Sequence, residues 1–156
     1  MGNDTAGNAI DSGYVASSME GLVWGEDQAA DAVGNTSNDD MIANPDNLKY
    51  SESLRTLFIG EDSGRHVNNY VWAYNIDTGK LSRILSTPSG AEATGLQAVD
   101  NLNGFAYVMS NFQHAGEYIG SMDATLKADV DPLINSMWNN KKKAAIGYIS
   151  GIPAMH

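Results

Sequence analysis

The chain has 156 residues, no cysteine and a formal net charge of −10 at pH 7, with 42% hydrophobic residues, which is typical of a globular domain. The absence of cysteine excludes disulfides, thiolate catalysis and cysteine-ligated metals. The negative charge repels the phosphate backbone, so nucleic-acid binding is not expected, and no apolar run reaches the roughly 18 residues of a membrane span.

The first 48 residues hold nine acidic side chains and no Lys or Arg, whereas residues 49–156 hold ten acidic and nine basic side chains. An acidic segment either keeps the surface solvated or attracts hard cations such as Ca²⁺. Residues 26–32 favour about two helical turns with acids near their start, and residues 34–47 are rich in loop-forming residues. We therefore divide the chain into an acidic, loop-rich N-terminal segment, residues 1–48, and a β domain, residues 49–156.

Beyond residue 55 the sequence follows the two-residue period of β-strands and is rich in β-branched and aromatic residues. Asp77–Lys80 is typical of a tight hairpin turn, in which Gly79 takes a positive φ. Trp72 lies within a strand and is expected to be buried. The predicted strands are Thr56–Gly60, Tyr70–Ile76, Leu81–Ser86, Ala93–Val99 and Phe105–Asn111. Their spacing predicts an antiparallel meander.

The C-terminal part is expected to add one helix and one strand to the β domain. Asp131 is a candidate N-cap, and Pro132 is a candidate first helical residue. The segment Leu133–Trp138 then carries apolar residues at helical spacing. Ile146–Ile149 is short and β-prone. The expected fold class is therefore mainly β, with a short C-terminal helix.

Polar motifs flank the first predicted strand. Asp46 lies in Asn-Pro-Asp-Asn-Leu before this strand, and Glu61 and Asp62 end it. Adjacent carboxylates on a strand point to opposite faces, so one is available to a ligand while the other bonds backbone or solvent. Arg65, in the loop that follows, either holds a phosphoryl group or pairs at the surface with Glu61 or Asp62. His66 is expected to be exposed in the same loop.

Two more polar motifs accompany the later strands. Glu92 lies in Ala-Glu-Ala-Thr-Gly, where it is either an exposed residue of an edge strand or a buried carboxylate that needs a cation, an Arg or a backbone donor. Asn111–Glu117 reads Asn-Phe-Gln-His-Ala-Gly-Glu and forms a compact polar cluster. Because Ca²⁺ prefers oxygen ligands, we favour a hydrogen-bonded corner for Gln113 and His114 and keep Glu117 as a candidate ligand.

In this order the motifs resemble the C-terminal part of the PhoX-type alkaline phosphatases, which are calcium-dependent phosphatases built on a β-propeller. The likeness covers residues 40–120 and extends to residues 144–153. It rests on Asn-Pro-Asp-Asn-Leu before Leu-Phe-Ile, on Glu-Ala-Thr-Gly and, above all, on Gln-His-Ala-Gly-Glu, where the family has Gln-His-Pro-Gly-Glu. The resemblance implies that the meander forms one to two propeller blades, whose strand ends face a central channel.

The resemblance also implies a metal-dependent phosphomonoesterase, a hydrolase whose calcium and iron ions neutralise the phosphoryl oxygens of a phosphate ester. The candidate metal ligands are Glu61, Asp62, Glu92, Glu117 and Asp46, and Arg65 is the candidate phosphate-binding residue, while the catalytic residues stay unassigned. The chain lacks the family's cysteine ligand and its Arg-Pro-Glu motif. We therefore expect a part of such an enzyme that is inactive alone, with iron only when the N-terminal part is present.

The alternative is a non-catalytic, propeller-derived β module. A blade takes about 40–50 residues, so this chain cannot close a ring, and its unpaired strand edges need cover. We therefore expect a fragment that self-associates or that a second polypeptide completes. The start of the chain has no signal-peptide pattern. The family resemblance favours a periplasmic or extracellular location.

Overall fold

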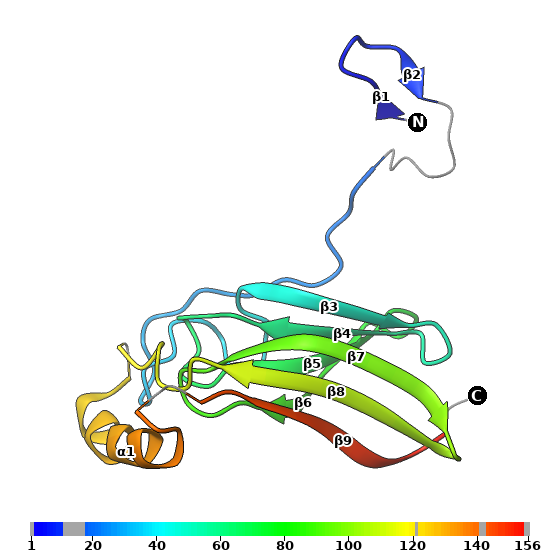
Figure 1. Ribbon diagram of the computed structural model, residues 1–156. Coiled ribbons are helices and arrows are strands. Elements are labelled where there is room, and N and C mark those ends of the chain that lie inside the picture. Colours follow the sequence, from blue (N-terminus) through cyan, green and yellow to red (C-terminus); the bar gives the residue numbers. More distant parts are fainter. Residues whose placement is uncertain (1, 11–17, 121, 141–142, 155–156) are drawn as a thin grey trace.

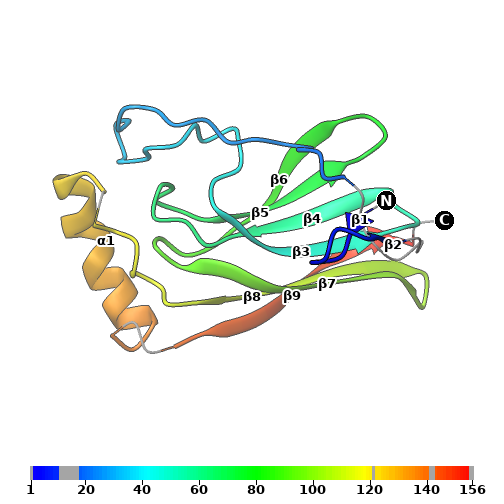
Figure 2. The same cartoon turned by 90° about the horizontal axis from the view of Figure 1, so that it is seen from above.

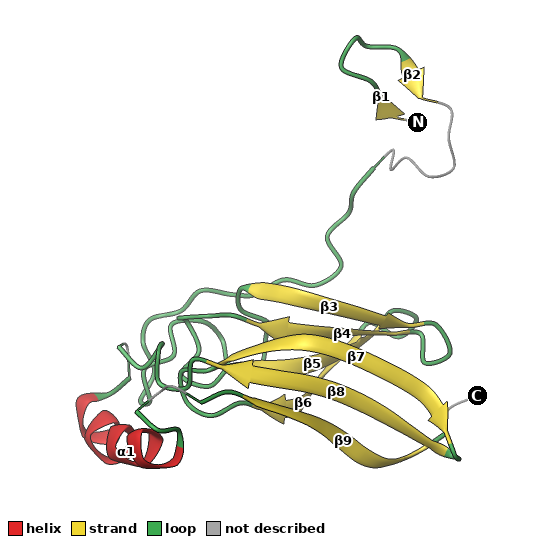
Figure 3. Ribbon diagram, viewed as in Figure 1, coloured by secondary structure: helices red, strands yellow, loops and turns green. Residues whose placement is uncertain are grey.

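The computed structural model describes residues 2–10, 18–120, 122–140 and 143–154. Two antiparallel sheets pack on each other, and one helix lies at one end of them (Figures 1 and 3). A separate two-stranded pairing joins β1 (Gly2–Asn3) to β2 (Ala9–Ile10). The expected mainly β class with a short helix is confirmed. Within the described ranges, no helix is long and apolar enough to cross a membrane.

The first sheet is an antiparallel meander of four strands in the order in which they follow along the chain. The tight turn expected after residue 76 is confirmed, because Gly79 has a φ of 67° and its N–H donates to Asn75 O over 2.9 Å. Trp72 is buried, as expected, and pairs with Arg83 of the next strand. The strands are β3 (Pro45–Ser51), β4 (Thr56–Glu61), β5 (Tyr70–Asn75) and β6 (Lys80–Ser86).

The second sheet has three strands, β7 (Glu92–Leu102), β8 (Phe105–Gln113) and β9 (Ala145–Pro153), in this order. The first two are the predicted strands, each extended by a few residues. The helix α1 (Ala124–Met137) lies between β8 and β9 in the chain. The long connection brings β9 back antiparallel to β8, with Val108 opposite Ile149.

The helix begins eight residues earlier than the sequence predicted, so Pro132 lies inside it. Asp123, not Asp131, is the N-cap, because its carboxylate accepts the N–H groups of Thr125 and Leu126 at 2.9 and 3.1 Å. The predicted start was wrong because Asp-Pro is a strong local helix-start pattern. Proline inside a helix costs a backbone hydrogen bond, which the packing of Ile134 against the body of the protein offsets.

No helix forms over residues 26–32, so that prediction was wrong. One carboxylate oxygen of Asp31 accepts the backbone N–H groups of Val33, Gly34 and Asn35 at 2.8–2.9 Å. This local bonding gives the backbone an alternative to helical hydrogen bonds. The segment therefore runs as an ordered loop.

The two sheets meet along a shared apolar layer. Its buried members are Phe58, Val71, Ala93, Leu96 and Val108, which come from both sheets. The closest approach is at Gly60, where an added Cβ atom would lie 2.6 Å from Ala93 O. Glycine at this position therefore lets β4 and β7 pack backbone against backbone.

The acidic N-terminal segment covers the opposite face of the first sheet. Ile42 is buried against Ile59 and Trp72, and Val23 packs on the same cluster. Asp39 adds polar links, because it accepts a hydrogen bond from Tyr70 Oη at 2.6 Å and binds Arg83 at 2.8 Å. This part of the acidic segment is therefore integral to the fold.

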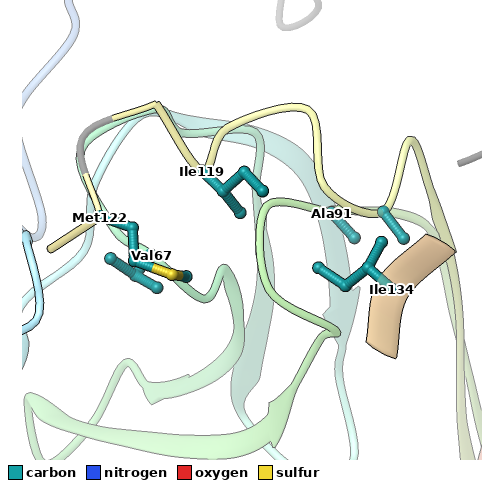
Figure 4. Close-up of a cluster of buried hydrophobic side chains, with 6 residues drawn as sticks. Val67, Ala91, Ile119, Met122 and Ile134 are labelled. Carbon is teal, nitrogen blue, oxygen red and sulfur yellow. The ribbon is translucent and has the colours of Figure 1, made fainter. Parts of the chain in front are cut away.

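The helix covers the loops at one end of the sheets. Val67 and Ala91 project from those loops toward Met122, Ile119 and Ile134, so that α1 and the segment before it close this end (Figure 4). The loops that carry the predicted polar motifs lie at the same end.

Candidate functional site

Three predicted site residues meet where β4 and β8 end and β7 begins. Asp62 directly follows β4, and Glu92 opens β7. Glu92 is paired in register with Gln113, the last residue of β8, and the turn after it carries His114 and Glu117. Because β4 and β7 approach closely at Gly60, the loop that follows β4 lies beside the start of β7.

The core of this cluster is a pair of carboxyl groups. Glu92 is 8% exposed. Burial, together with a hydrogen bond to Asp62 and the charge of Asp62, raises the pKa of Glu92 to about 7. Oδ1 of Asp62 is buried and accepts no hydrogen bond from a described residue. Near neutral pH the Glu92 carboxyl group is therefore protonated in part of the molecules.

The turn after β8 surrounds Glu92 with polar groups. Gln113 Nε2 donates to Glu92 Oε1, and His114 Nε2 lies 3.7 Å from the same oxygen. His114 Nδ1 is 3.5 Å from Glu117 Oε2. The turn takes this shape because His114 and Gly116 both have positive φ, at 57° and 84°. Gln113 thus hydrogen-bonds the Glu92 carboxylate rather than loop backbone, His114 lies between two carboxylates at longer distances, and Glu117 stands half exposed beside them.

Tyr118 is a member of the cluster that the sequence reasoning missed. Its hydrogen bond to Asp62 raises the pKa of Tyr118 to about 12, helped by burial and by the charges of Asp62, Glu117 and Glu92. The phenol is therefore a proton donor at all physiological pH values. The sequence feature that could have indicated Tyr118 as a member of the cluster is its position directly after the Gln-His-Ala-Gly-Glu motif.

Glu61 points away from this cluster, as alternation along the strand predicted for one of the two adjacent acids. It is fully buried and accepts four hydrogen bonds. Oε1 accepts from Ala43 N and Trp72 Nε1 at 2.8 and 2.7 Å, and Oε2 accepts from Tyr70 N and His66 Nδ1 at 2.9 and 3.1 Å. Glu61 therefore binds backbone and side-chain donors and has no oxygen free for a metal.

His66 is fully buried, so the expectation of an exposed loop histidine was wrong. Burial alone would lower its pKa, but the hydrogen bond and charge of Glu61 outweigh that effect and raise the pKa of His66 above its usual value. The loop sequence has no periodicity that would have indicated an inward direction for this side chain.

The other two candidate residues lie outside the cluster. Arg65 forms a surface ion pair with Asp27, at 2.9 Å, with both side chains largely exposed. Asp46 is exposed on β3, where Asn47 donates to its carboxylate. The contacts of the described residues thus bring together Asp62, Glu92 and Glu117 and leave Arg65 and Asp46 elsewhere.

A cation at this place would be held by Asp62 and Glu92 first. Their oxygens match the preference of Ca²⁺, and the bare Asp62 Oδ1 has an unused acceptor position. However, no three Asp, Glu or His side chains among the described residues are arranged to enclose one metal ion. The described residues therefore place two carboxylates close together here, with Glu117 beside them.

Comparisons of this chain with protein-family models, with curated proteins and with solved structures gave no match.

The raised pKa values predict that stability falls as pH rises toward neutrality. Below pH 4.5 Glu92 is protonated in both states, and between 4.5 and about 7 only the folded state holds the proton. The free energy of unfolding should therefore decrease across this window, by on the order of 2 kcal/mol. His66 contributes with the same sign, because its favourable charged form is lost as pH rises through its raised pKa.

Urea unfolding from pH 4.5 to 8 measures this dependence. Glu92→Gln, which cannot titrate, should flatten the profile and leave the decline that His66 contributes. Glu52→Gln, on an exposed side chain, should follow the wild type. A wild-type profile that rises steadily from pH 5 to 8 would contradict the assignment of a proton to Glu92.

Proposed function

We propose that this chain is part of a metal-dependent phosphomonoesterase similar to the PhoX-type alkaline phosphatases. The observation that supports the proposal is the meeting of Asp62, Glu92 and Glu117, which are separated by up to 55 residues in sequence. All three are among the candidate metal ligands that the family resemblance implies. A meander followed by a second packed sheet is also compatible with two adjacent propeller blades.

In this proposal the chain provides carboxylates at one wall of a larger site. Asp62 and Glu92 hold a calcium ion, and Glu117 stands at the exposed rim. A bound cation would supply charge neutralisation for the phosphoryl oxygens of the ester. Tyr118 and Gln113 keep the two carboxylates oriented through their hydrogen bonds. The remaining ligands, iron and the phosphate-binding groups come from a second polypeptide or segment, in a periplasmic or extracellular protein.

The second candidate is a non-catalytic, propeller-derived β module. It is favoured by the position of Arg65, which is paired with Asp27 and contributes no positive charge to the carboxylate cluster. A phosphate ester would therefore meet mainly negative groups on this chain. In that case the carboxyl pair of Asp62 and Glu92 has a structural role and binds no ligand.

Calcium titration distinguishes the two candidates. The purified chain, stripped with a chelator and held at pH 7.5, should gain several degrees in Tm at millimolar Ca²⁺, because the ion binds only the folded state. Glu92→Gln should remove most of that gain, whereas Glu52→Gln should retain it. No stabilisation of the wild type at millimolar Ca²⁺ would show that Asp62 and Glu92 do not hold a calcium ion on this chain, and would favour the structural module.

The chain by itself is expected not to hydrolyse p-nitrophenyl phosphate, with or without Ca²⁺, because it lacks the family's cysteine ligand and Arg-Pro-Glu motif and because Arg65 is paired with Asp27. Intact mass must show that only the 156-residue chain is present. Turnover by such a preparation, lost in Glu92→Gln, would show that the chain is a complete catalyst and contradict this expectation.

A further inference from the structure

A pocket lies where three parts of the chain meet, at the end of the sheets that α1 covers. The acidic loop before β3 reaches the start of α1 (Figure 2), and Asp123 N donates to Val33 O over 3.1 Å. The loops that follow β4 and β6 bound the same space from the side of the sheets. The pocket has a volume of about 240 Å³ and lies apart from the carboxylate cluster, with which it shares no residue.

One side of the pocket is polar, and we call the side chains of Asp39, Asn68, Tyr70 and Ser89 its floor. The hydroxyl groups of the floor already donate, Tyr70 Oη to Asp39 Oδ1 over 2.6 Å and Ser89 Oγ to Asn68 Oδ1 over 3.2 Å. Asn68 Nδ2 donates to Thr87 O over 2.8 Å. The oxygen atoms of these side chains retain lone pairs. The floor therefore presents mainly hydrogen-bond acceptors, and it matches a ligand that donates.

The charge around the floor is negative. Among the described residues that line the pocket, Asp39 alone is charged. Its partner Arg83 is shared with Asp40, at 2.8 and 3.0 Å, so one guanidinium group faces two carboxylates. The N-terminal segment that carries both acids, residues 1–48, has no Lys or Arg. The floor therefore attracts a cationic group and repels an anionic one.

The rest of the pocket wall is apolar and comes mainly from α1 and the segment before it. Leu126 and Val130 are four residues apart on one face of the helix, about 6 Å along its axis. Met122 and Val67, which are 5% and 4% exposed, extend this surface and lie next to each other in Figure 4. An aliphatic chain can bury its methylene groups against this wall.

We propose that this pocket binds the ammonium group of a small aliphatic amine, whose chain lies against Leu126 and Val130. An ammonium group has three N–H donors and no acceptor, so it matches a floor of acceptors. The Asp39 carboxylate pairs with its charge through a charge-assisted hydrogen bond. An alcohol of the same length lacks the charge, and a fatty carboxylate would meet Asp39 with like charge. The site does not depend on the proposed phosphatase function, because none of its residues belongs to the carboxylate cluster.

Titration of the wild-type chain with n-butylammonium chloride, at constant ionic strength and followed by amide NMR shifts, tests the site. The shifts should map to Asn68, Ser89 and Leu126, with a Kd about tenfold or more below that of n-butanol, because only the amine forms charge-assisted hydrogen bonds. Sodium butyrate should not shift these amides. Nα-acetyl-lysine amide carries the same ammonium group on a peptide unit. A lower Kd for butylammonium would identify a free amine as the source, and a lower Kd for the lysine derivative would identify a lysine side chain.

Variants locate the binding. Val130→Trp fills the space against the helix and should weaken butylammonium binding about tenfold or more, whereas Ala128→Trp, at an exposed position of the same helix, should retain it. Asp39→Asn removes the charge of the floor and should weaken binding to a similar extent, with far-UV circular dichroism to show that the variant is folded. Glu92→Gln should bind as the wild type does, which separates this pocket from the carboxylate cluster. Equal Kd values for butylammonium and butanol, or wild-type binding by Val130→Trp, would overturn the proposal.

Discussion

Replacing Glu61 with glutamine is expected to destabilise the protein by about 3–5 kcal/mol, the range for breaking a buried charge pair by removing one partner, here the pair with His66. The carboxylate accepts hydrogen bonds from four donors at 2.7–3.1 Å. An amide of the same shape has one oxygen, so its NH₂ group must face two donors and cannot bond to either. It also removes the charge that favours protonated His66. Most small proteins have only about 5–15 kcal/mol of total stability, so the variant should be partly unfolded at 37 °C.

Urea unfolding at pH 6 measures this loss. Glu52→Gln is the matched control, because the same chemical change falls on an exposed side chain, and it should shift the free energy by less than about 0.5 kcal/mol. If Glu61→Gln unfolded at the wild-type urea concentration, the four-donor arrangement would be wrong.

The second large effect is expected from Gly60→Ala. The new methyl group would lie 2.6 Å from Ala93 O, and the atom that it meets is backbone, which cannot rotate away. The two sheets must therefore separate locally, at a cost of about 2–3 kcal/mol, comparable to other overpacking changes in protein cores. Because Gly60 lies two residues before Asp62, the same shift should separate Asp62 from Glu92.

Two measurements distinguish this effect from a general loss of stability. Thermal unfolding should show a lower Tm for Gly60→Ala, while Gly120→Ala, where an added Cβ meets no atom within 4 Å, should change Tm little. NMR titration of the Glu92 carboxyl should show its pKa falling from about 7 in Gly60→Ala, because separating the sheets reduces its burial, the largest cause of the raised pKa, and weakens its contact with Asp62. An unchanged Tm and pKa would mean that the sheets do not approach closely at this point.

The strands between residues 56 and 111 were predictable because their signal is local. Alternating apolar residues and the turn at Gly79 are properties of short windows. β3 was not predicted as a strand, because Pro-Asp-Asn at its start favours turns and most of its residues are exposed. It is held by pairing with β4, from Pro45 opposite Glu61 to Ser51 opposite Thr56, which no window of its own sequence reveals.

The candidate site was predictable in part, and for a different reason. Each motif alone is a common strand end, and only their order, compared with a known family, pointed to Asp62, Glu92 and Glu117 together. Alternation along the strand predicted that Glu61 and Asp62 point to opposite faces. Which of the two side chains is buried depends on Ala43 and Trp72, which donate hydrogen bonds to Glu61. The burial of His66 depends on Glu61 and on the distant carbonyl of Asn38, which lie within hydrogen-bond distance of its two ring nitrogens.

The hydrogen bond from Ala43 to Glu61 has a consequence for the dynamics of the protein. The loop before β3 supplies one of the four donors to this carboxylate, and Ile42 beside it is part of the cluster around Trp72. If the loop opened alone, the Glu61 carboxylate would stay buried with only three of its four donors, which is unfavourable. The loop and the first sheet should therefore open as one cooperative unit, in which amide hydrogens of Ala43, Tyr70 and Trp72 exchange at a common rate.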